Sequence, residues 1–303
     1  MINLPEFFRW QSENKSFYFN GASLAVYLIF AILTGISVLL LWTFKRPIYR
    51  WFNAKSTHLR IFSTRALKTT IGASIIVFMS LRSLLLIVSN YKNMYEALPF
   101  HLCRLLLIVT AFCLLFNKLN FIKYYGSVAL IGALVAIVNP SFDFVEPIKP
   151  QKIGLDSIYF YDYIFIHCFL ILIVAAIFVI TPTQLKPIDF LITLILFIAI
   201  ALLAFGINWL TYEYASSNSW KSNYLYLGKD DINSQANLFG PLSKWPWNLI
   251  TWICVGLLAH GISMIIWMVQ DKIVIDLING KFSIKIRRSE HWHRFKAKSF
   301  VKV

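Results

Sequence analysis

Seven apolar runs, most of them about 20 residues long, limit what this chain of 303 residues can fold into. A helix needs about 20 apolar residues to cross the hydrocarbon core of a bilayer. The chain is 58% hydrophobic and only 14% charged, whereas an ordinary soluble domain is about 25% charged. This composition excludes a disordered chain, a nucleic-acid-binding domain and a soluble enzyme. The pattern predicts an all-α fold, a polytopic membrane helix bundle of seven spans at residues 21–44, 70–90, 98–116, 124–140, 160–181, 188–212 and 247–270.

The distribution of Lys and Arg predicts the orientation of the bundle. The net charge is +15, which in a soluble protein would suggest nucleic acid. Here, alternate connections differ sharply, because one set holds nineteen basic residues and the other set holds six. Cytoplasmic loops of membrane proteins collect Lys and Arg. We therefore predict an extracytoplasmic amino-terminal segment (1–20), a seven-helix membrane domain (21–270) and a basic cytoplasmic tail (271–303), with no nucleic-acid partner.

Two regions outside the spans are candidate contact surfaces. The basic, aromatic tail contacts a protein partner, lies on anionic lipid or only fixes the orientation of the chain. The connection at 213–246 is rich in Trp and Tyr, which suits a protein partner but also an ordinary interfacial aromatic belt. Membrane lipid is the expected partner in either case. Usage rich in Lys, Ile, Asn and Phe suggests a low-G+C bacterium, and hence a bacterial plasma membrane protein.

Polar side chains within the predicted spans gather in one layer of the outer half of the membrane. At about 1.5 Å per residue, Arg82 lies about 12 Å below the outer surface, and His101 and Arg104 lie about 5 and about 9 Å below it. Ionisable groups inside a membrane are costly and mark a site or a buried structural pair. We predict a polar cavity in which His101 and His167 are catalytic. Five further residues are predicted to bind substrate: Arg82, Arg104, Asn139, Asn208 and Asn223.

The arginines and histidines each allow a second interpretation. The guanidinium groups of Arg82 and Arg104 suit an anionic group such as a phosphate, but they could instead pair with Asp162 or Glu213. Each histidine could be a buried imidazole that only bonds to a neighbouring helix. The four cysteines form no CxxC pair, so neither a disulfide framework nor a zinc site is expected.

Several short motifs resemble those of the YwaF-like bacterial integral membrane proteins. They occur in the same order over roughly residues 20–270, and the tail after 271 lies outside the resemblance. The matching stretches are Leu98-Pro99-Phe100-His101-Leu102-Cys103, Gly132-Ala133-Leu134 with Asn139-Pro140, Phe165-Ile166-His167, Asn208-Trp209-Leu210-Thr211, Asn223-Tyr224-Leu225-Tyr226-Leu227, Gly240-Pro241 and Trp245-Pro246-Trp247.

The resemblance implies a seven-helix bundle with a polar centre. The YwaF-like family is similar to a eukaryotic group of multi-pass acyltransferases that act on ether phospholipids. In that group a cysteine precedes the histidine of the third helix, whereas Phe100 stands at this position here. The resemblance therefore does not carry a cysteine nucleophile to this chain. It places five matched residues in the polar centre: His101, Asn139, His167, Asn208 and Asn223.

Three functions remain open on the sequence. The leading hypothesis is a phospholipid acyltransferase or lipid hydrolase that uses a histidine as general base, since histidine is the usual base near neutral pH. The alternatives are a non-catalytic structural subunit of a larger membrane assembly and a transporter-like protein that binds a small solute or lipid. No cofactor motif is visible, and no cofactor or metal is expected.

Overall fold

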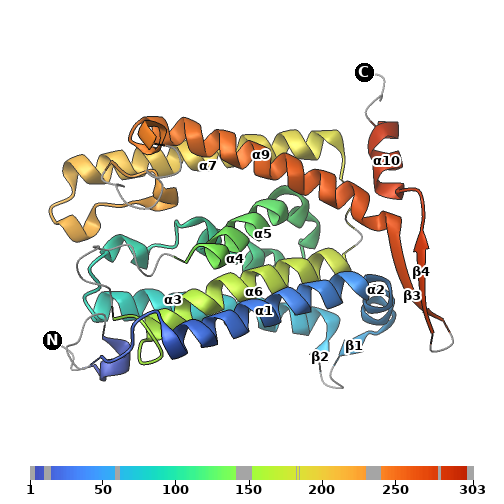
Figure 1. Cartoon of the computed structure of the whole chain (residues 1–303), viewed down its shortest axis with the longest axis horizontal. Coiled ribbons are helices and arrows are strands. Elements are labelled where there is room, and N and C mark those ends of the chain that lie inside the picture. The colour runs from blue at the N-terminus through green and yellow to red at the C-terminus, as the bar shows by residue number, and fades with distance from the viewer. Residues whose placement is uncertain are drawn as a thin grey trace.

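The computed structural model describes residues 4–9, 15–58, 62–140, 152–181, 183, 185–229, 240–278 and 281–298. Its long helices run side by side as an elongated bundle (Figure 1). Within the described residues, seven helical segments are long and apolar enough to cross a membrane, which confirms the predicted number of spans. Their helices are α1 (Gly21–Thr43), α3 (Thr64–Val88), α4 (Leu102–Leu115), α5 (Ile122–Val138), α6 (Ile158–Ile180), α7 (Pro187–Tyr214) and α9 (Trp247–Val269).

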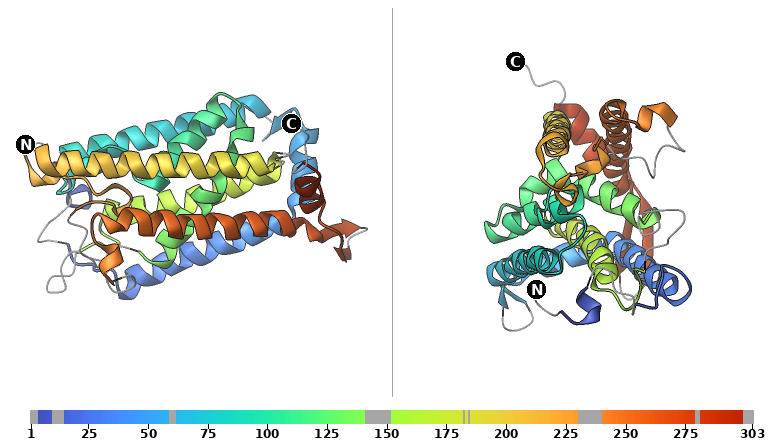
Figure 2. Two further views of the ribbon diagram at one scale, coloured as in Figure 1. Left: turned by 90° about the horizontal axis from the view of Figure 1, so that it is seen from above. Right: turned by 90° about the vertical axis from the view of Figure 1, so that its left-hand side faces the viewer.

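Short elements cover the two ends of the bundle (Figures 1 and 2). We call them the basic end and the loop end. The basic end carries α2 (Lys45–Ala54), β1 (Thr57–His58), β2 (Phe62–Ser63), η3 (Leu119–Phe121), η7 (Gln270–Lys272), β3 (Ile273–Ile278), β4 (Lys281–Ile286) and α10 (Glu290–Lys298). The loop end carries η1 (Glu6–Phe8), η2 (Met94–Ala97), η4 (Asn218–Trp220), η5 (Tyr224–Tyr226) and η6 (Gly240–Ser243).

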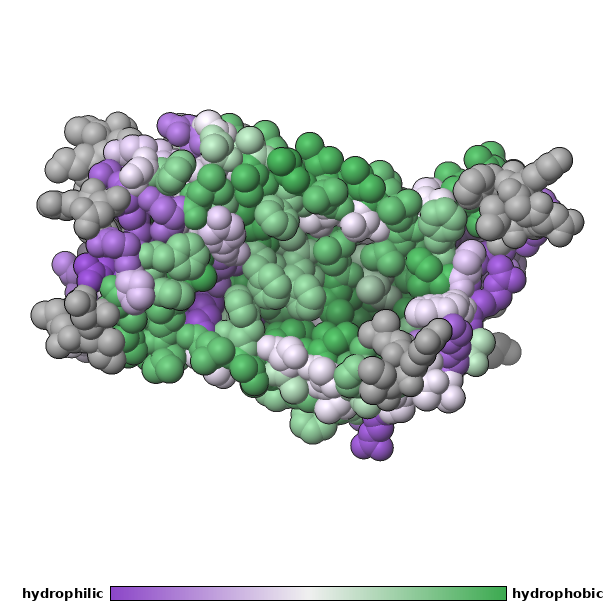
Figure 3. Space-filling model, turned by 90° about the horizontal axis from the view of Figure 1, so that it is seen from below, coloured by the Kyte–Doolittle hydropathy of each residue, from purple (hydrophilic) through white to green (hydrophobic). Residues whose placement is uncertain are grey.

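The surface along the helices is apolar. Figure 3 shows a broad hydrophobic band between two hydrophilic ends. Large side chains such as Leu33 on α1, Leu203 on α7 and Leu258 on α9 are more than half exposed. A soluble protein rarely exposes a continuous apolar area of this kind, whereas a bilayer core accepts it. The surface therefore agrees with a multi-pass membrane protein.

The largest buried hydrophobic cluster among the described residues lies between α3, α4, α5 and α6. Leu107, Ala129 and Val174 are fully buried in it. Two glycines let the helices approach closely, as small residues commonly do in membrane bundles. A Cβ atom on Gly72 would lie 2.8 Å from the Ala111 carbonyl oxygen of α4, and a Cβ on Gly126 would lie about 2.5 Å from the Phe178 ring of α6. These contacts fix the four helices that hold the polar side chains described below.

Two boundaries differ from the sequence prediction for clear physical reasons. Helix α3 begins at Thr64 instead of residue 70, because Ser63 caps it by accepting a hydrogen bond from Ala66 N at 3.1 Å. The basic tail contains an antiparallel hairpin, in which Ile273 pairs with Ile286. Alternation of polar and apolar residues along β4, Lys281–Ile286, is the signal for this hairpin, and the high charge of the tail obscures it.

Candidate functional site

Four charged side chains meet between α3, η2, α4 and α6 towards the loop end. Arg82 donates from Nε to Asp162 Oδ2 at 2.8 Å, and Arg104 donates from Nη1 to Glu96 Oε2 at 2.9 Å. Two longer contacts complete the set: Arg82 Nη2 lies 3.5 Å from Glu96 Oε2, and Arg104 Nη2 lies 3.8 Å from Asp162 Oδ2. We call these residues the four-ion cluster. Each arginine contacts both carboxylates. The cluster has no net charge, because two guanidinium groups balance two carboxylates.

The four-ion cluster is shielded from solvent. The side chain of Arg82 is 5% exposed and that of Asp162 is 11% exposed. Arg82 also donates from Nη1 to the Glu96 carbonyl oxygen at 2.8 Å, which ties η2 to α3. The predicted alternative of pairing with Asp162 is therefore present, and Glu96 takes the place of Glu213, which pairs with Lys229 at 3.0 Å. An anionic substrate would have to displace a carboxylate to reach either guanidinium group.

His167 on α6 is held in one tautomer. Its Nδ1 lies 2.7 Å from the carbonyl oxygen of Tyr163, one turn earlier on the helix. A carbonyl oxygen only accepts hydrogen bonds, so Nδ1 carries the proton and Nε2 keeps its lone pair. The Tyr163 ring packs on the imidazole with centroids 4.2 Å apart, and its hydroxyl donates to the Ala136 carbonyl oxygen of α5 at 2.7 Å. His167 thus offers Nε2 as an oriented proton acceptor.

His101 precedes the first turn of α4 and lies among aromatic rings. Its imidazole centroid is 6.2, 5.6 and 6.0 Å from the rings of Tyr95, Tyr224 and Tyr226 respectively. Among the residues that the structure describes, the imidazole has no hydrogen-bond partner. His101 precedes Arg104 by three residues and His167 follows Asp162 by five, so both histidines lie next to members of the four-ion cluster along the chain. The two predicted catalytic histidines therefore belong to one region, beside the four-ion cluster.

Asn208 fastens a loop-end segment to α7. Its Nδ2 donates to the Tyr224 carbonyl oxygen at 2.9 Å, and its Oδ1 accepts from Tyr224 N at 2.9 Å and from Ser222 Oγ at 2.9 Å. The side chain is 1% exposed. Its amide is therefore engaged on both sides by the protein, which is the arrangement expected of a structural clip.

Tyr224 connects the segment held by Asn208 to the residues around His101. Its hydroxyl donates to the Tyr95 carbonyl oxygen at 2.6 Å. Burial raises the pKa of the Tyr224 phenol, so the group stays protonated and remains a donor. Asn223 accepts a hydrogen bond from Gly228 N at 2.8 Å, which closes the loop around η5. These contacts position the aromatic rings that surround His101.

Replacing Asn208 with alanine is expected to release this loop. The change leaves the backbone N–H of buried Tyr224 without its partner, and an unsatisfied buried group costs about 1–3 kcal/mol. The Tyr224 carbonyl oxygen loses one of two donors and keeps the bond from Leu227 N at 3.2 Å. We expect faster cleavage near residue 222 in limited proteolysis of the detergent-solubilised protein. Asn139→Ala is a matched control, because Asn139 lies exposed at the end of α5. Equal cleavage rates for Asn208→Ala and wild type would contradict the structural role.

The structure thus divides the seven predicted site residues into three groups. Four come together between α3, α4 and α6, namely Arg82, His101, Arg104 and His167. Asn208 and Asn223 shape the loop beside them. Asn139 lies apart, with an exposed side chain at the C-terminal end of α5. The catalytic and substrate-binding roles of all seven remain predictions.

Sequence reasoning missed Glu96, which completes the four-ion cluster. The predicted spans 70–90 and 98–116 leave Glu96 in the connection between them, yet the third candidate span of the structure, Met94–Leu115, includes η2. The useful signal is charge balance, because two arginines inside spans need two acids and only Asp162 lies beside them in a helix. The aromatic side chains of Tyr95 and Tyr224 carry no comparable signal in the sequence.

Other polar groups in the spans lie outside this region. Asp189 pairs with Lys123 at 2.8 Å, and His260 Nδ1 lies 3.0 Å from Ser127 Oγ while its ring stacks on Phe190. Across the described part of the chain, no three His, Cys, Asp or Glu side chains gather as a possible metal-binding set.

Comparison with known proteins gives one result. No curated protein and no solved structure matches the chain. The model of one family matches residues 18–264, which include all seven candidate spans apart from the last residues of the final one. The matched residues also contain the four-ion cluster and both histidines, and they end before the hairpin of the tail. The chain belongs to the TMEM164 family, a family of multi-pass membrane proteins.

Proposed function

We propose that this protein is a phospholipid-modifying enzyme of the leaflet at the loop end, with His167 as general base. The single observation that carries the proposal is the bond from His167 Nδ1 to the Tyr163 carbonyl oxygen. In the neutral imidazole that bond places the proton on Nδ1, leaves the Nε2 lone pair as the proton acceptor and fixes the ring orientation, all of which suit a general base. The base lies beside buried charges, where ionisable groups commonly mark a site.

The proposed reaction is acyl transfer between two lipids. The hydroxyl of a lysophospholipid gives its proton to His167 Nε2 as its oxygen forms a bond to the carbonyl carbon of a donor phospholipid ester. The tetrahedral intermediate then breaks its bond to the donor glycerol oxygen, which takes the proton back from Nε2. One ester is broken and one is formed. Water in place of the lysophospholipid gives a free fatty acid, which is the hydrolase form of the same chemistry.

The neighbouring residues support the base in different ways. His101 has ring nitrogens that are available to bind a substrate oxygen, and three tyrosine rings restrain it. The four-ion cluster holds η2, α3, α4 and α6 together. Since the cluster is internally neutral, we assign it a positioning role and not a role in binding a headgroup phosphate.

The resemblance to YwaF-like proteins and to ether-phospholipid acyltransferases supports acyl chemistry on lipids. Phe100 stands at the position where the eukaryotic acyltransferase group carries a cysteine, so the proposal uses direct transfer assisted by a base instead of an acyl-cysteine intermediate. On the orientation predicted from Lys and Arg, the leaflet at the loop end is the outer leaflet of a bacterial plasma membrane.

Labelled lipid provides the test. The purified protein is reconstituted with phosphatidylcholine that carries deuterated acyl chains, together with an unlabelled lysophospholipid, and lipid species are followed by mass spectrometry. We expect labelled acyl chains on the lysophospholipid, or free labelled fatty acid when the acceptor is omitted. Absence of both products from folded wild-type protein would refute the proposal, and so would equal product formation by His167→Gln.

A further inference from the structure

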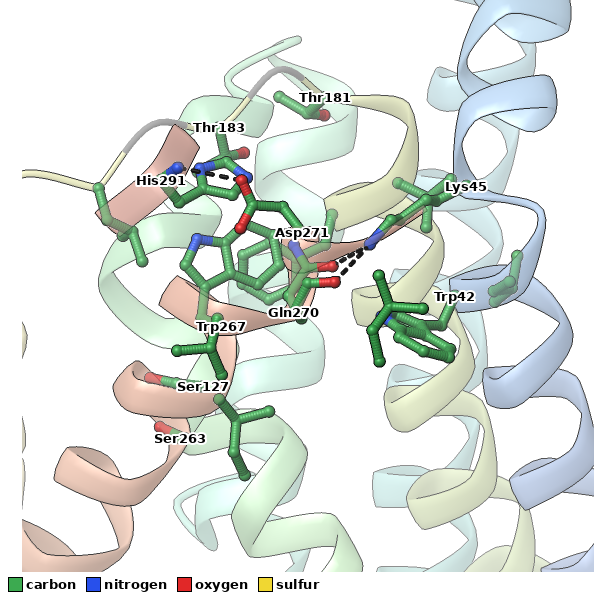
Figure 4. A pocket seen from close by; sticks show the side chains of 18 of the residues that line it. Trp42, Lys45, Ser127, Thr181, Thr183, Ser263, Trp267, Gln270, Asp271 and His291 are labelled. Carbon is green, nitrogen blue, oxygen red and sulfur yellow. Dashed lines mark hydrogen bonds between the residues drawn. The ribbon is translucent and has the colours of Figure 1, made fainter. Parts of the chain in front are cut away.

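A large cavity lies at the basic end, away from both histidines of the candidate site. Its volume is about 1140 Å³, and its walls come from α1, α2, α5, α6, α9 and the segments around the tail hairpin (Figure 4). None of the seven predicted site residues lines it. The cavity is therefore separate from the candidate site.

The inner part of the cavity is apolar. Leu130 and Ile131 of α5, Ala175 and Phe178 of α6, and Met264 of α9 line it. These helices belong to the hydrophobic bundle, so this part of the wall lies where a lipid bilayer has its acyl chains. A purely ionic ligand would gain nothing from such a wall, whereas a hydrocarbon chain would gain burial.

The mouth of the cavity is rich in basic side chains. Six basic residues line it against two acidic ones. Asp271 is already engaged, because its Oδ2 accepts from Glu290 N at 2.7 Å and from His291 N at 3.1 Å. The basic residues are Lys45, Arg46 and Arg50 of α2, Lys123 of α5, and Arg287 and Arg288 after β4, and the acids are Asp271 and Glu290.

Buried donors without partners lie between the apolar wall and the basic mouth. Thr181 and Thr183 are 8% and 5% exposed. Their hydroxyls and the indole Nε1 of Trp267 have no hydrogen-bond partner among the described residues. All three side chains line the cavity, as Figure 4 shows. Buried polar groups are normally satisfied, so a rotation that turns these three donors toward a ligand in the cavity would break no existing hydrogen bond.

We propose that this cavity binds an anionic phospholipid from the leaflet at the basic end. An acyl chain lies along the apolar wall, and the phosphate lies at the mouth near Lys45, Arg287 and Arg288. Thr181, Thr183 and Trp267 can turn toward the phosphate and ester oxygens without losing a hydrogen bond. On the predicted orientation this leaflet is cytoplasmic, which is the leaflet that holds anionic lipid in attractive range of polybasic segments.

Part of the wall of this cavity comes from the C-terminal segment, which lies outside the region matched by the family model. The family model ends at residue 264, whereas Arg287, Arg288 and His291 line the mouth. The backbone N of Arg287 donates to the Lys272 carbonyl oxygen at 2.8 Å, which holds the arginine pair beside α9. The tail therefore completes the lipid site.

Native mass spectrometry of the full chain tests the site. Wild-type protein in detergent is titrated with phosphatidylglycerol or phosphatidylcholine of equal chain length. The double variant R287Q/R288Q is compared with K285Q/K296Q, which removes the same charge from the same region at residues that do not line the cavity. We expect about a tenfold loss of phosphatidylglycerol affinity in R287Q/R288Q and no loss in the control. Equal losses in both variants would overturn the proposal.

A steric variant separates a lipid from a free anion. Ala175→Phe fills the apolar wall without changing charge, so it should weaken phosphatidylglycerol binding in a protein whose far-ultraviolet circular dichroism is unchanged. Inorganic phosphate in excess should not displace the lipid. Displacement by phosphate, together with undiminished binding in Ala175→Phe, would identify a free-anion site and refute the lipid site. Neither result depends on acyl-transfer activity.

The same experiment can measure how phosphatidylglycerol affinity depends on pH. Burial lowers the pKa of Lys45 to about 8, and its Nζ donates to the Gln270 carbonyl oxygen at 3.0 Å. Lys45 is mostly charged at pH 7 and mostly neutral at pH 9, so phosphatidylglycerol should bind more weakly at pH 9. Binding unchanged over this interval would place the phosphate away from Lys45. The charged and titratable groups that share the mouth with it are Arg46, Arg50, Lys123, Asp271, Arg287, Arg288, Glu290 and His291.

Discussion

Replacing Arg82 with methionine is expected to destabilise the folded protein by about 3–5 kcal/mol, the usual cost of breaking a buried ion pair by removing one partner. The change removes the 2.8 Å contact to Asp162 and leaves two carboxylates with one arginine inside the bundle. Unfolding by sodium dodecyl sulfate in mixed micelles, followed by circular dichroism, measures the loss.

A double variant distinguishes this cause from lost packing. Arg82→Met with Asp162→Leu removes one charge of each sign and keeps Arg104 bound to Glu96 at 2.9 Å. The free energy of unfolding of the double variant should therefore exceed that of either single variant. Glu213→Gln is the exposed-pair control, because surface ion pairs contribute about 0–1 kcal/mol. Additive losses in the double variant would mean that the four-ion cluster is not an electrostatic unit.

Replacing His167 with alanine is expected to lower kcat for acyl transfer by about 10²–10⁴-fold, the usual contribution of a general base. The variant removes Nε2, while the partner carbonyl of Tyr163 remains within the helix. KM should change little if His167 acts only in the chemical step. Product formation in proteoliposomes, measured by mass spectrometry against lipid concentration, separates the two parameters.

Two comparisons make this result specific. His167→Gln retains a donor for the Tyr163 carbonyl but has no proton acceptor of suitable strength, so it should be as inactive as His167→Ala. His260→Gln changes a histidine of the spans that bonds to Ser127 instead, and it should retain wild-type turnover. His101→Ala should raise KM if His101 binds substrate. Full activity in His167→Gln would remove His167 from the role of base.

The sequence was sufficient for the spans, because their signal is local and depends on length and hydropathy. It also identified Arg82, Arg104 and Asp162 as costly charges, since their cost in a membrane does not depend on their partners. Which acid faces which arginine depends on helix rotation, and this is set by close contacts such as that of Gly72 with α4. No local pattern encodes that rotation.

The remaining misses have a similar origin. Glu96 lies in a short 3₁₀ segment before α4, where hydropathy cannot distinguish an entering span from a surface loop. The hydrogen bonds of the Asn208 side-chain amide depend on a partner sixteen residues later, at Tyr224. The cavity at the basic end requires the tail to fold back beside α9, and its residues are widely separated in the sequence.

The short helix α4 has a consequence for the surrounding bilayer. It spans 14 residues, or about 21 Å at 1.5 Å per residue, whereas the hydrocarbon core is about 30 Å thick. The chain covers the missing length with η2 and an extended stretch, and such non-helical backbone is tolerated at membrane depth only when protein or water surrounds it. The distance between the histidines and the lipid headgroups is then set partly by lipid chain length. Bilayer thickness therefore affects how deep the histidines lie below the headgroups, through hydrophobic mismatch at the loop end.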